Sequence, residues 1–164
     1  MNKIRIIITV FLTSILQIAL APRISIFGVT PSFSIPVLVM LSIGFGSFEG
    51  GFSGLFLGLI EDVYFSNMLG PRALIYFVIC YIMGHFEYRI STKNNRIGIG
   101  LTALFTMLNF LFILLGELVF SGSLNIASYL FGPIFIEIVL NSLIYYFMMK
   151  FFNKFFIFPN IRFY

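Results

Sequence analysis

The chain has 164 residues, of which 60% are hydrophobic and only 10% are charged, and its mean hydropathy is +1.06. Soluble domains contain roughly 45–50% apolar residues and cover their surface with charge. This composition therefore excludes an ordinary soluble domain and predicts an all-α integral membrane protein. The pI near 9.4 does not indicate nucleic-acid binding, because the basic residues lie in short clusters between apolar runs.

Six apolar runs follow one another along the chain, separated by glycine, proline and polar clusters. A helix needs about 20 mostly apolar residues to cross the ~30 Å hydrocarbon core of a bilayer. We therefore expect one transmembrane domain, residues 1–164, that forms a six-helix bundle with spans at about 4–21, 33–48, 51–65, 71–88, 97–120 and 129–152. The second and third spans are short, and Glu49-Gly50-Gly51 predicts a tight break between them, as in a helical hairpin.

The charges between the runs predict how the chain is oriented, since cytoplasmic loops carry an excess of Lys and Arg. With six spans and a cytoplasmic N-terminus, only Arg23 and Arg72 fall on the outer side. The basic residues on the cytoplasmic side are then Lys3, Arg5, Arg89, Lys93, Arg96, Lys150, Lys154 and Arg162. We therefore expect both termini to be cytoplasmic.

Ionisable side chains cluster where the third span ends and the fourth begins. A charge at the centre of a span costs about 2.5–3.5 kcal/mol on insertion scales, so each one needs a physical reason. Glu61 and Asp62 lie near the outer end of the third span, and Arg72 opens the fourth on the same side. We expect a carboxylate–guanidinium pair that closes this hairpin. A site for a partner or a substrate is the alternative.

The last two spans also carry polar side chains. Glu137 and Asn141 are four residues apart, so both project from one face of the sixth helix and should face protein rather than lipid. Asn109 in the fifth span is a candidate hydrogen-bond partner for them, because an amide in hydrocarbon seeks any available donor or acceptor.

Glycines recur at four-residue spacing in the third span, at Gly50, Gly54 and Gly58. This spacing places them on one helix face, where a second backbone can approach closely, and it predicts a packing seam.

Sequence patterns of catalysis and of metal or cofactor binding are missing. His85 is the only histidine, and Glu87 points to nearly the opposite side of a helix, so the two cannot form a metal-binding face. The chain has no Gly-x-Ser-x-Gly, no His-Glu-x-x-His and no phosphate-binding loop, and Cys80 is its only cysteine. We therefore expect no catalytic residue, no metal and no cofactor.

The spacing Gly54-x-x-x-Gly58-x-x-x-Asp62, followed by Leu69-Gly70, resembles the rod shape-determining protein MreD family. Chains of that family are of similar length and show a glycine-rich span that ends in Asp, then a Leu-Gly turn into the next span. Asn141 also occupies the place of an Asn that is often found in the final helix of the family.

The resemblance implies a non-enzymatic scaffold in the bacterial cytoplasmic membrane. It implies binding to the single-span protein MreC and a link, direct or indirect, between the actin-like MreB filament and the cell-wall synthases. It also implies a six-helix bundle similar to the substrate-binding subunits of energy-coupling-factor vitamin transporters. The interaction surface would be the glycine seam together with the outer corner at Asp62 and Arg72. Membrane lipid is the other expected contact, and a homodimer is left open.

Two other classes of function remain as alternatives. A vitamin-binding subunit of an energy-coupling-factor transporter would have a similar architecture, and Glu137 with Asn141 could line its cavity. Such subunits carry an Ala-x-x-x-Ala pattern on the first helix, whereas the first span here offers only Ala19 and Ala21. An intramembrane enzyme would have to assemble its reactive groups from Glu61, Asp62, Glu137 and His85, and it is the least favoured class.

Overall fold

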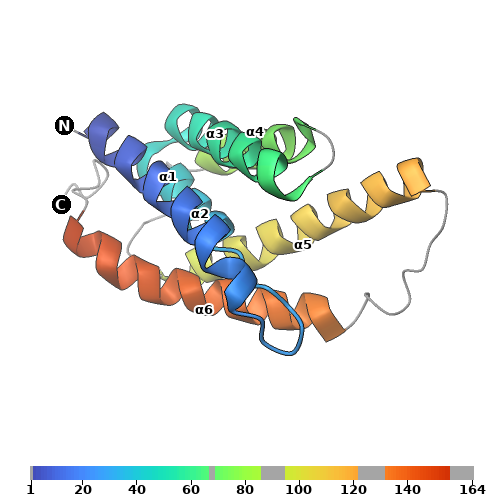
Figure 1. Cartoon of the computed structure of the whole chain (residues 1–164). Helices are drawn as coiled ribbons and strands as arrows, with labels where there is room; N and C mark the ends of the chain where they lie inside the picture. Colours follow the sequence, from blue (N-terminus) through green and yellow to red (C-terminus); the bar gives the residue numbers. More distant parts are fainter. Residues whose placement is uncertain (1, 67–68, 86–94, 122–131, 156–164) are drawn as a thin grey trace.

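The computed structural model describes residues 2–66, 69–85, 95–121 and 132–155, and these residues are all-helical (Figure 1). A single 3-10 turn, η1 (Ala21–Arg23), follows the first helix. The α-helices in the described residues are α1 (Asn2–Ala19), α2 (Ser34–Phe45), α3 (Ser47–Phe65), α4 (Pro71–His85), α5 (Asn95–Ser121) and α6 (Gly132–Phe155).

Three stretches of the described chain are long and apolar enough to cross a membrane, namely Lys3–Arg23, Arg96–Leu115 and Gly132–Phe152. The α2 and α4 helices are apolar but have 12 and 15 residues. At 1.5 Å per residue they extend only about 18 Å and 22 Å, less than the ~30 Å hydrocarbon core. The described part of the chain is thus all-helical with the apolar helices of a membrane protein, and the crossing of the bilayer by all six helices stays a prediction.

The break between the second and third helices lies at Gly46, not at Glu49-Gly50-Gly51 as the sequence suggested. Gly46 has φ +96°, a backbone conformation that favours glycine, and it ends α2 and precedes α3. Glu49, Gly50 and Gly51 belong instead to the first turns of α3. The two glycines stay helical because they are buried against neighbouring helices: a Cβ at Gly50 would meet Ser42 of α2, and one at Gly51 would meet the Phe77 ring of α4.

The α2 helix is the centre of the bundle. Every residue from Ser34 to Gly44 is buried, and the helix packs against α1, α3, α4, α5 and α6. Its apolar residues are spread over all sides, as expected for a helix surrounded by protein. The Ser42 hydroxyl donates to the Leu38 carbonyl oxygen at 2.8 Å, so this buried polar group is satisfied within its own helix.

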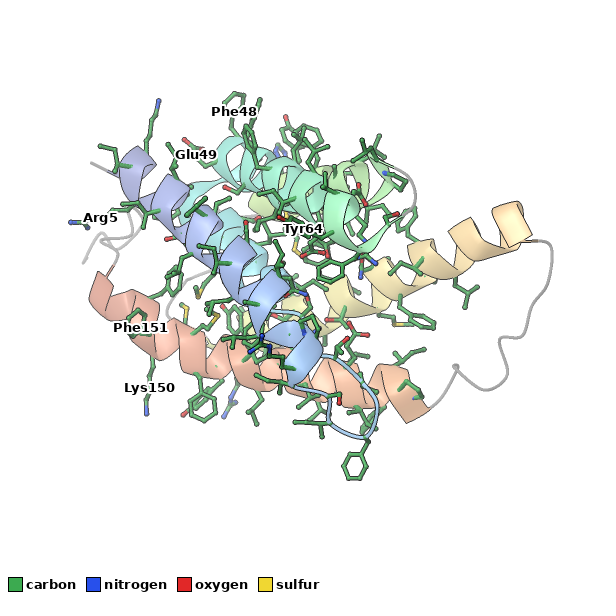
Figure 2. All side chains as sticks on the ribbon, viewed as in Figure 1. Arg5, Phe48, Glu49, Tyr64, Lys150 and Phe151 are labelled. Atoms are coloured by element: carbon green, nitrogen blue, oxygen red, sulfur yellow. The ribbon has the colours of Figure 1, made fainter. Side chains whose placement is uncertain are left out.

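The other helices pair around this centre. The α3 and α4 helices form the most extensively packed pair, while α5 packs with α6 on the other side of the molecule (Figure 1). The first turn of α1 and the last turn of α6 lie at the same end of the bundle, and Ile6 and Phe152 both belong to the buried core. Large apolar side chains such as Phe151 point outward, as expected where lipid is the solvent (Figure 2).

Candidate functional site

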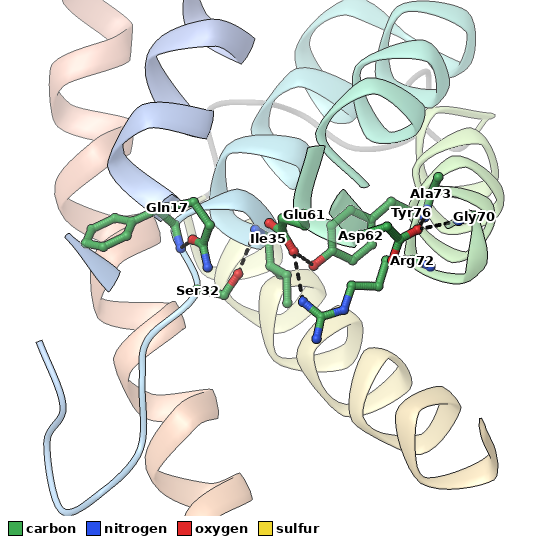
Figure 3. A network of polar contacts seen from close by, with 10 residues as sticks. Gln17, Ser32, Ile35, Glu61, Asp62, Gly70, Arg72, Ala73 and Tyr76 are labelled. Atoms are coloured by element: carbon green, nitrogen blue, oxygen red, sulfur yellow. Dashed lines mark hydrogen bonds and ion pairs between the residues drawn. The ribbon is translucent and has the colours of Figure 1, made fainter. Parts of the chain in front are cut away.

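Asp62 closes the corner between α3 and α4 by accepting hydrogen bonds from the start of α4 (Figure 3). Its Oδ2 accepts from the backbone N–H groups of Gly70 at 2.9 Å and Ala73 at 3.3 Å, and its Oδ1 accepts from Arg72 N–H at 3.3 Å. The first N–H groups of a helix have no partner within the helix, and no water is available for them in a lipid-embedded bundle. Asp62 is fully buried and therefore acts as a helix cap rather than as a surface group.

Backbone geometry explains the glycine and the proline in the turn that precedes α4. Gly70 has φ +111°, which a residue with a side chain adopts only with strain. Pro71 follows as the first residue of α4, where its missing N–H would have had no partner in any case. Asp62, Gly70 and Pro71 together turn the chain from α3 into α4.

Glu61 forms the ion pair that the sequence led us to expect at this corner. The Arg72 guanidinium Nη1 lies 3.5 Å from Glu61 Oε2, and the Tyr76 hydroxyl donates to the same oxygen at 2.9 Å (Figure 3). Arg72 and Tyr76 are one helical turn apart on α4, so both face α3. The Tyr76 ring also packs edge-on against Phe105 of α5, with centroids 5.5 Å apart. This polar cluster therefore ties α3 and α4 to α5.

The glycines of α3 form a seam that is filled by the protein itself. A Cβ at Gly54 would fall 2.7 Å from the Tyr76 carbonyl oxygen, and one at Gly58 would fall 2.6 Å from the Ala73 backbone nitrogen. Both distances are far below van der Waals contact. The two backbones approach this closely only because side chains are absent, and α4 occupies the face that was expected to be an interaction surface.

Asn141 connects three parts of the bundle. Its Oδ1 accepts from Ser32 N–H at 2.8 Å, and its Nδ2 donates to Thr106 Oγ1 of α5 at 3.1 Å. Gln17 of α1 similarly accepts from Phe33 N–H at 2.7 Å (Figure 3). Side chains from α1 and α6 thus satisfy the free N–H groups where the chain enters the central helix α2. The sequence indicated that Asn141 faces protein, but it did not reveal Thr106, Ser32 or Gln17 as participants.

Asn109 is buried but does not meet Asn141, because Thr106 occupies that place one turn earlier on α5. In the described part of the chain the Asn109 Oδ1 has no hydrogen-bond partner. Glu137 lies one turn from Asn141 on α6, beside the Asn141 amide and within electrostatic reach of Arg72. Glu137 and Asn141 therefore lie together, and Asn109 is separate from them.

Replacing Asn141 by Leu is expected to lower the free energy of unfolding by about 2 kcal/mol, because the buried Ser32 N–H loses its acceptor and the buried Thr106 hydroxyl oxygen loses a donor. The Asn109→Leu substitution is the matched control. It removes an amide whose oxygen makes no bond, so stability should be unchanged or slightly higher. Thermal unfolding of both variants in one detergent distinguishes them, and equal melting temperatures would contradict the role given to Asn141.

The described residues do not bring reactive side chains together into a catalytic or metal-binding group. No group of three or more His, Cys, Asp or Glu side chains that could hold a metal ion occurs within the described residues. Cys80 is fully buried. The Ser34 side chain lies beside the buried Glu61 carboxyl and interacts with it. The arrangement at the corner is suited to holding helices together.

Comparison with known proteins agrees with the motif. The family model described as rod shape-determining protein MreD matches residues 1–155. No curated protein and no solved structure matches the chain. A match over nearly the whole chain establishes that the chain belongs to the MreD family of rod shape-determining proteins.

Proposed function

We propose that this protein is a non-enzymatic scaffold subunit of the bacterial cell-elongation complex. In this role it binds MreC and couples the MreB filament, directly or indirectly, to peptidoglycan synthesis. The observation that carries the proposal is the family match over residues 1–155. The α3–α4 corner supports it, because the buried polar groups there serve helix packing and do not form a reactive centre.

The proposed setting is the cytoplasmic membrane, crossed six times, with both termini in the cytoplasm. The first turn of α1 and the last turn of α6 lie at one end of the bundle, which supports an even number of crossings. The uneven distribution of Lys and Arg supports the cytoplasmic location of that end. The short helices α2 and α4 can cross because their neighbours and the Asp62 cap satisfy their ends. A likeness to the substrate-binding subunits of energy-coupling-factor transporters remains part of this proposal.

Only some residues of the motif at the α3–α4 corner are exposed and can contact a partner. Asp62, Gly54 and Gly58 are buried, whereas Leu69 is 71% exposed and Arg72 is partly exposed. A large exposed apolar side chain beside a capped helix start offers an anchor for a partner helix or loop. We therefore assign the contact with MreC to the surface around Leu69.

Replacing Leu69 by Ser should reduce recovery of MreC with the tagged chain by about tenfold, since a buried Leu contact contributes roughly 1.5 kcal/mol or more. Leu74→Ser is the matched control, because Leu74 is 67% exposed on the lipid-facing side of α4. Both variants should keep the melting temperature of the parent protein. Equal recovery of MreC with both variants would remove Leu69 from the interface.

Affinity purification of the tagged chain from mild detergent, with mass spectrometry of the retained proteins and small molecules, tests the whole proposal. Recovery of MreC with cell-wall synthases supports it. The vitamin-binding alternative would instead place Glu137 and Asn141 in a ligand cavity. Recovery of paired ATPases and a vitamin would favour that alternative and contradict the scaffold role.

A further inference from the structure

An apolar groove of about 540 Å³ runs between α1 and α3 on the outside of the bundle. Its walls include Ile7 and Phe11 of α1 and Phe52 and Phe56 of α3, whose side chains remain largely exposed. The Ser53 hydroxyl also lines it, but it donates to the Glu49 carbonyl oxygen at 2.6 Å and therefore needs no further partner. The body of the groove thus offers only apolar contact.

One end of the groove carries one basic and one acidic side chain. Lys3 and Glu49 line it there, from the first turns of α1 and α3. Figure 2 shows Glu49 beside Phe48 at the start of α3, near the beginning of α1. Within the described residues neither the Lys3 ammonium nor the Glu49 carboxylate forms an ion pair. Both charges are therefore available to a ligand at this end.

The length of the groove decides between a lipid and a protein helix as its occupant. From Phe48 to Ile60, α3 rises about 18 Å at 1.5 Å per residue. One leaflet contributes about 15 Å of the ~30 Å hydrocarbon core. In the membrane orientation proposed above, the groove therefore starts at a headgroup region and ends near the bilayer centre, whereas a transmembrane helix would need a surface of twice that length.

We propose that this groove binds a phospholipid with a zwitterionic, primary-amine headgroup. One acyl chain lies between Ile7, Phe11, Phe52 and Phe56. The headgroup phosphate pairs with the Lys3 ammonium, and the headgroup ammonium donates hydrogen bonds to the Glu49 carboxylate. An anionic lipid without an amine could pair its phosphate with Lys3 but would have no group to donate to Glu49. A trimethylated ammonium also has no N–H to donate to this carboxylate. The site is independent of the contact with MreC, because it lies on α1 and α3, away from Leu69.

The test is native mass spectrometry of the full chain in detergent, with phosphatidylethanolamine, phosphatidylcholine and phosphatidylglycerol of identical acyl chains added in equal amounts. We expect phosphatidylethanolamine to be retained about five- to tenfold better than the other two, as one charge-assisted hydrogen bond would give. Glu49→Gln should abolish that preference. Ile7→Trp should lower the retention of all three lipids by filling the groove.

Ile8→Trp is the matched control, because Ile8 is the next residue of α1, is similarly exposed and does not line the groove. It should retain lipid like the parent protein. Equal retention of the three headgroups, an undiminished preference in Glu49→Gln, or equal effects of the two Trp substitutions would each overturn the proposal. So would photocrosslinking from position 52 in native membranes that captures a protein helix instead of lipid.

Discussion

Replacing Asp62 by Ala should lower the free energy of unfolding by about 3 kcal/mol or more. The substitution leaves the backbone N–H groups of Gly70, Arg72 and Ala73 without an acceptor. An unsatisfied buried donor costs roughly 1–3 kcal/mol, and loss of a helix cap costs about 1 kcal/mol even where water can replace it. Water cannot readily do so here, because Asp62 is fully buried between α3 and α4.

Asp62→Asn should fall between the parent protein and Asp62→Ala, because one amide oxygen can still accept while the charge is lost. Glu49→Ala serves as the control, since the Glu49 carboxylate makes no hydrogen bond in the described structure. Far-ultraviolet circular dichroism during heating in detergent is a suitable measurement, because the chain lacks Trp for fluorescence. A melting temperature of Asp62→Ala within a degree or two of Glu49→Ala would contradict the capping role.

This result bears on how the family motif is understood. A loss of MreC binding after Asp62→Ala would follow from the disordered start of α4 and would not identify Asp62 as a contact. Leu69→Ser separates the two effects, because Leu69 contributes exposed surface without capping the helix. Binding that is lost in Leu69→Ser with unchanged stability would locate the partner at the turn itself.

The sequence was a good guide to the helices and to the close packing of Gly54 and Gly58, because hydropathy and four-residue spacing act locally. Gly50, which was expected in the same seam, meets α2 instead of α4. It also indicated a carboxylate–guanidinium pair at the α3–α4 corner. It did not show which carboxylate pairs with Arg72. Consecutive helix residues diverge by about 100°, so Glu61 faces the side chains of α4 while Asp62 faces its first N–H groups, and only the packed hairpin determines this.

The long-range contacts were beyond sequence reasoning. Four residues near the second span, Gly44, Gly46, Gly50 and Gly51, are all able to break a helix, and only packing against Ser42 and Phe77 shows that the break is at Gly46. Asn141 and Ser32 are 109 residues apart in the chain. No local pattern indicates that side chains of α1 and α6 cap the entrance to α2, or that α2 is the central helix.

Gly58→Leu should be the most damaging single substitution in the seam, with a loss of about 3 kcal/mol in the free energy of unfolding. The first side-chain atom alone would fall 2.6 Å from the Ala73 nitrogen and 2.9 Å from the Arg72 carbonyl carbon. These are backbone atoms, so no rotamer change can relieve the overlap, and α4 must move away from α3. That movement would also stretch the Asp62 hydrogen bonds to the start of α4.

Gly100→Leu is the matched control for this experiment. Gly100 lies in α5 with nothing within 4 Å of an added Cβ, so Leu should be neutral or slightly stabilising through its higher helix propensity. Thermal unfolding of the two variants isolates the steric effect from the change in composition. If Gly58→Leu and Gly100→Leu melted at the same temperature, α3 and α4 would not be in backbone contact. The glycine seam would then be free for a partner, and the interaction surface would have to be reassigned from Leu69 to the face of α3.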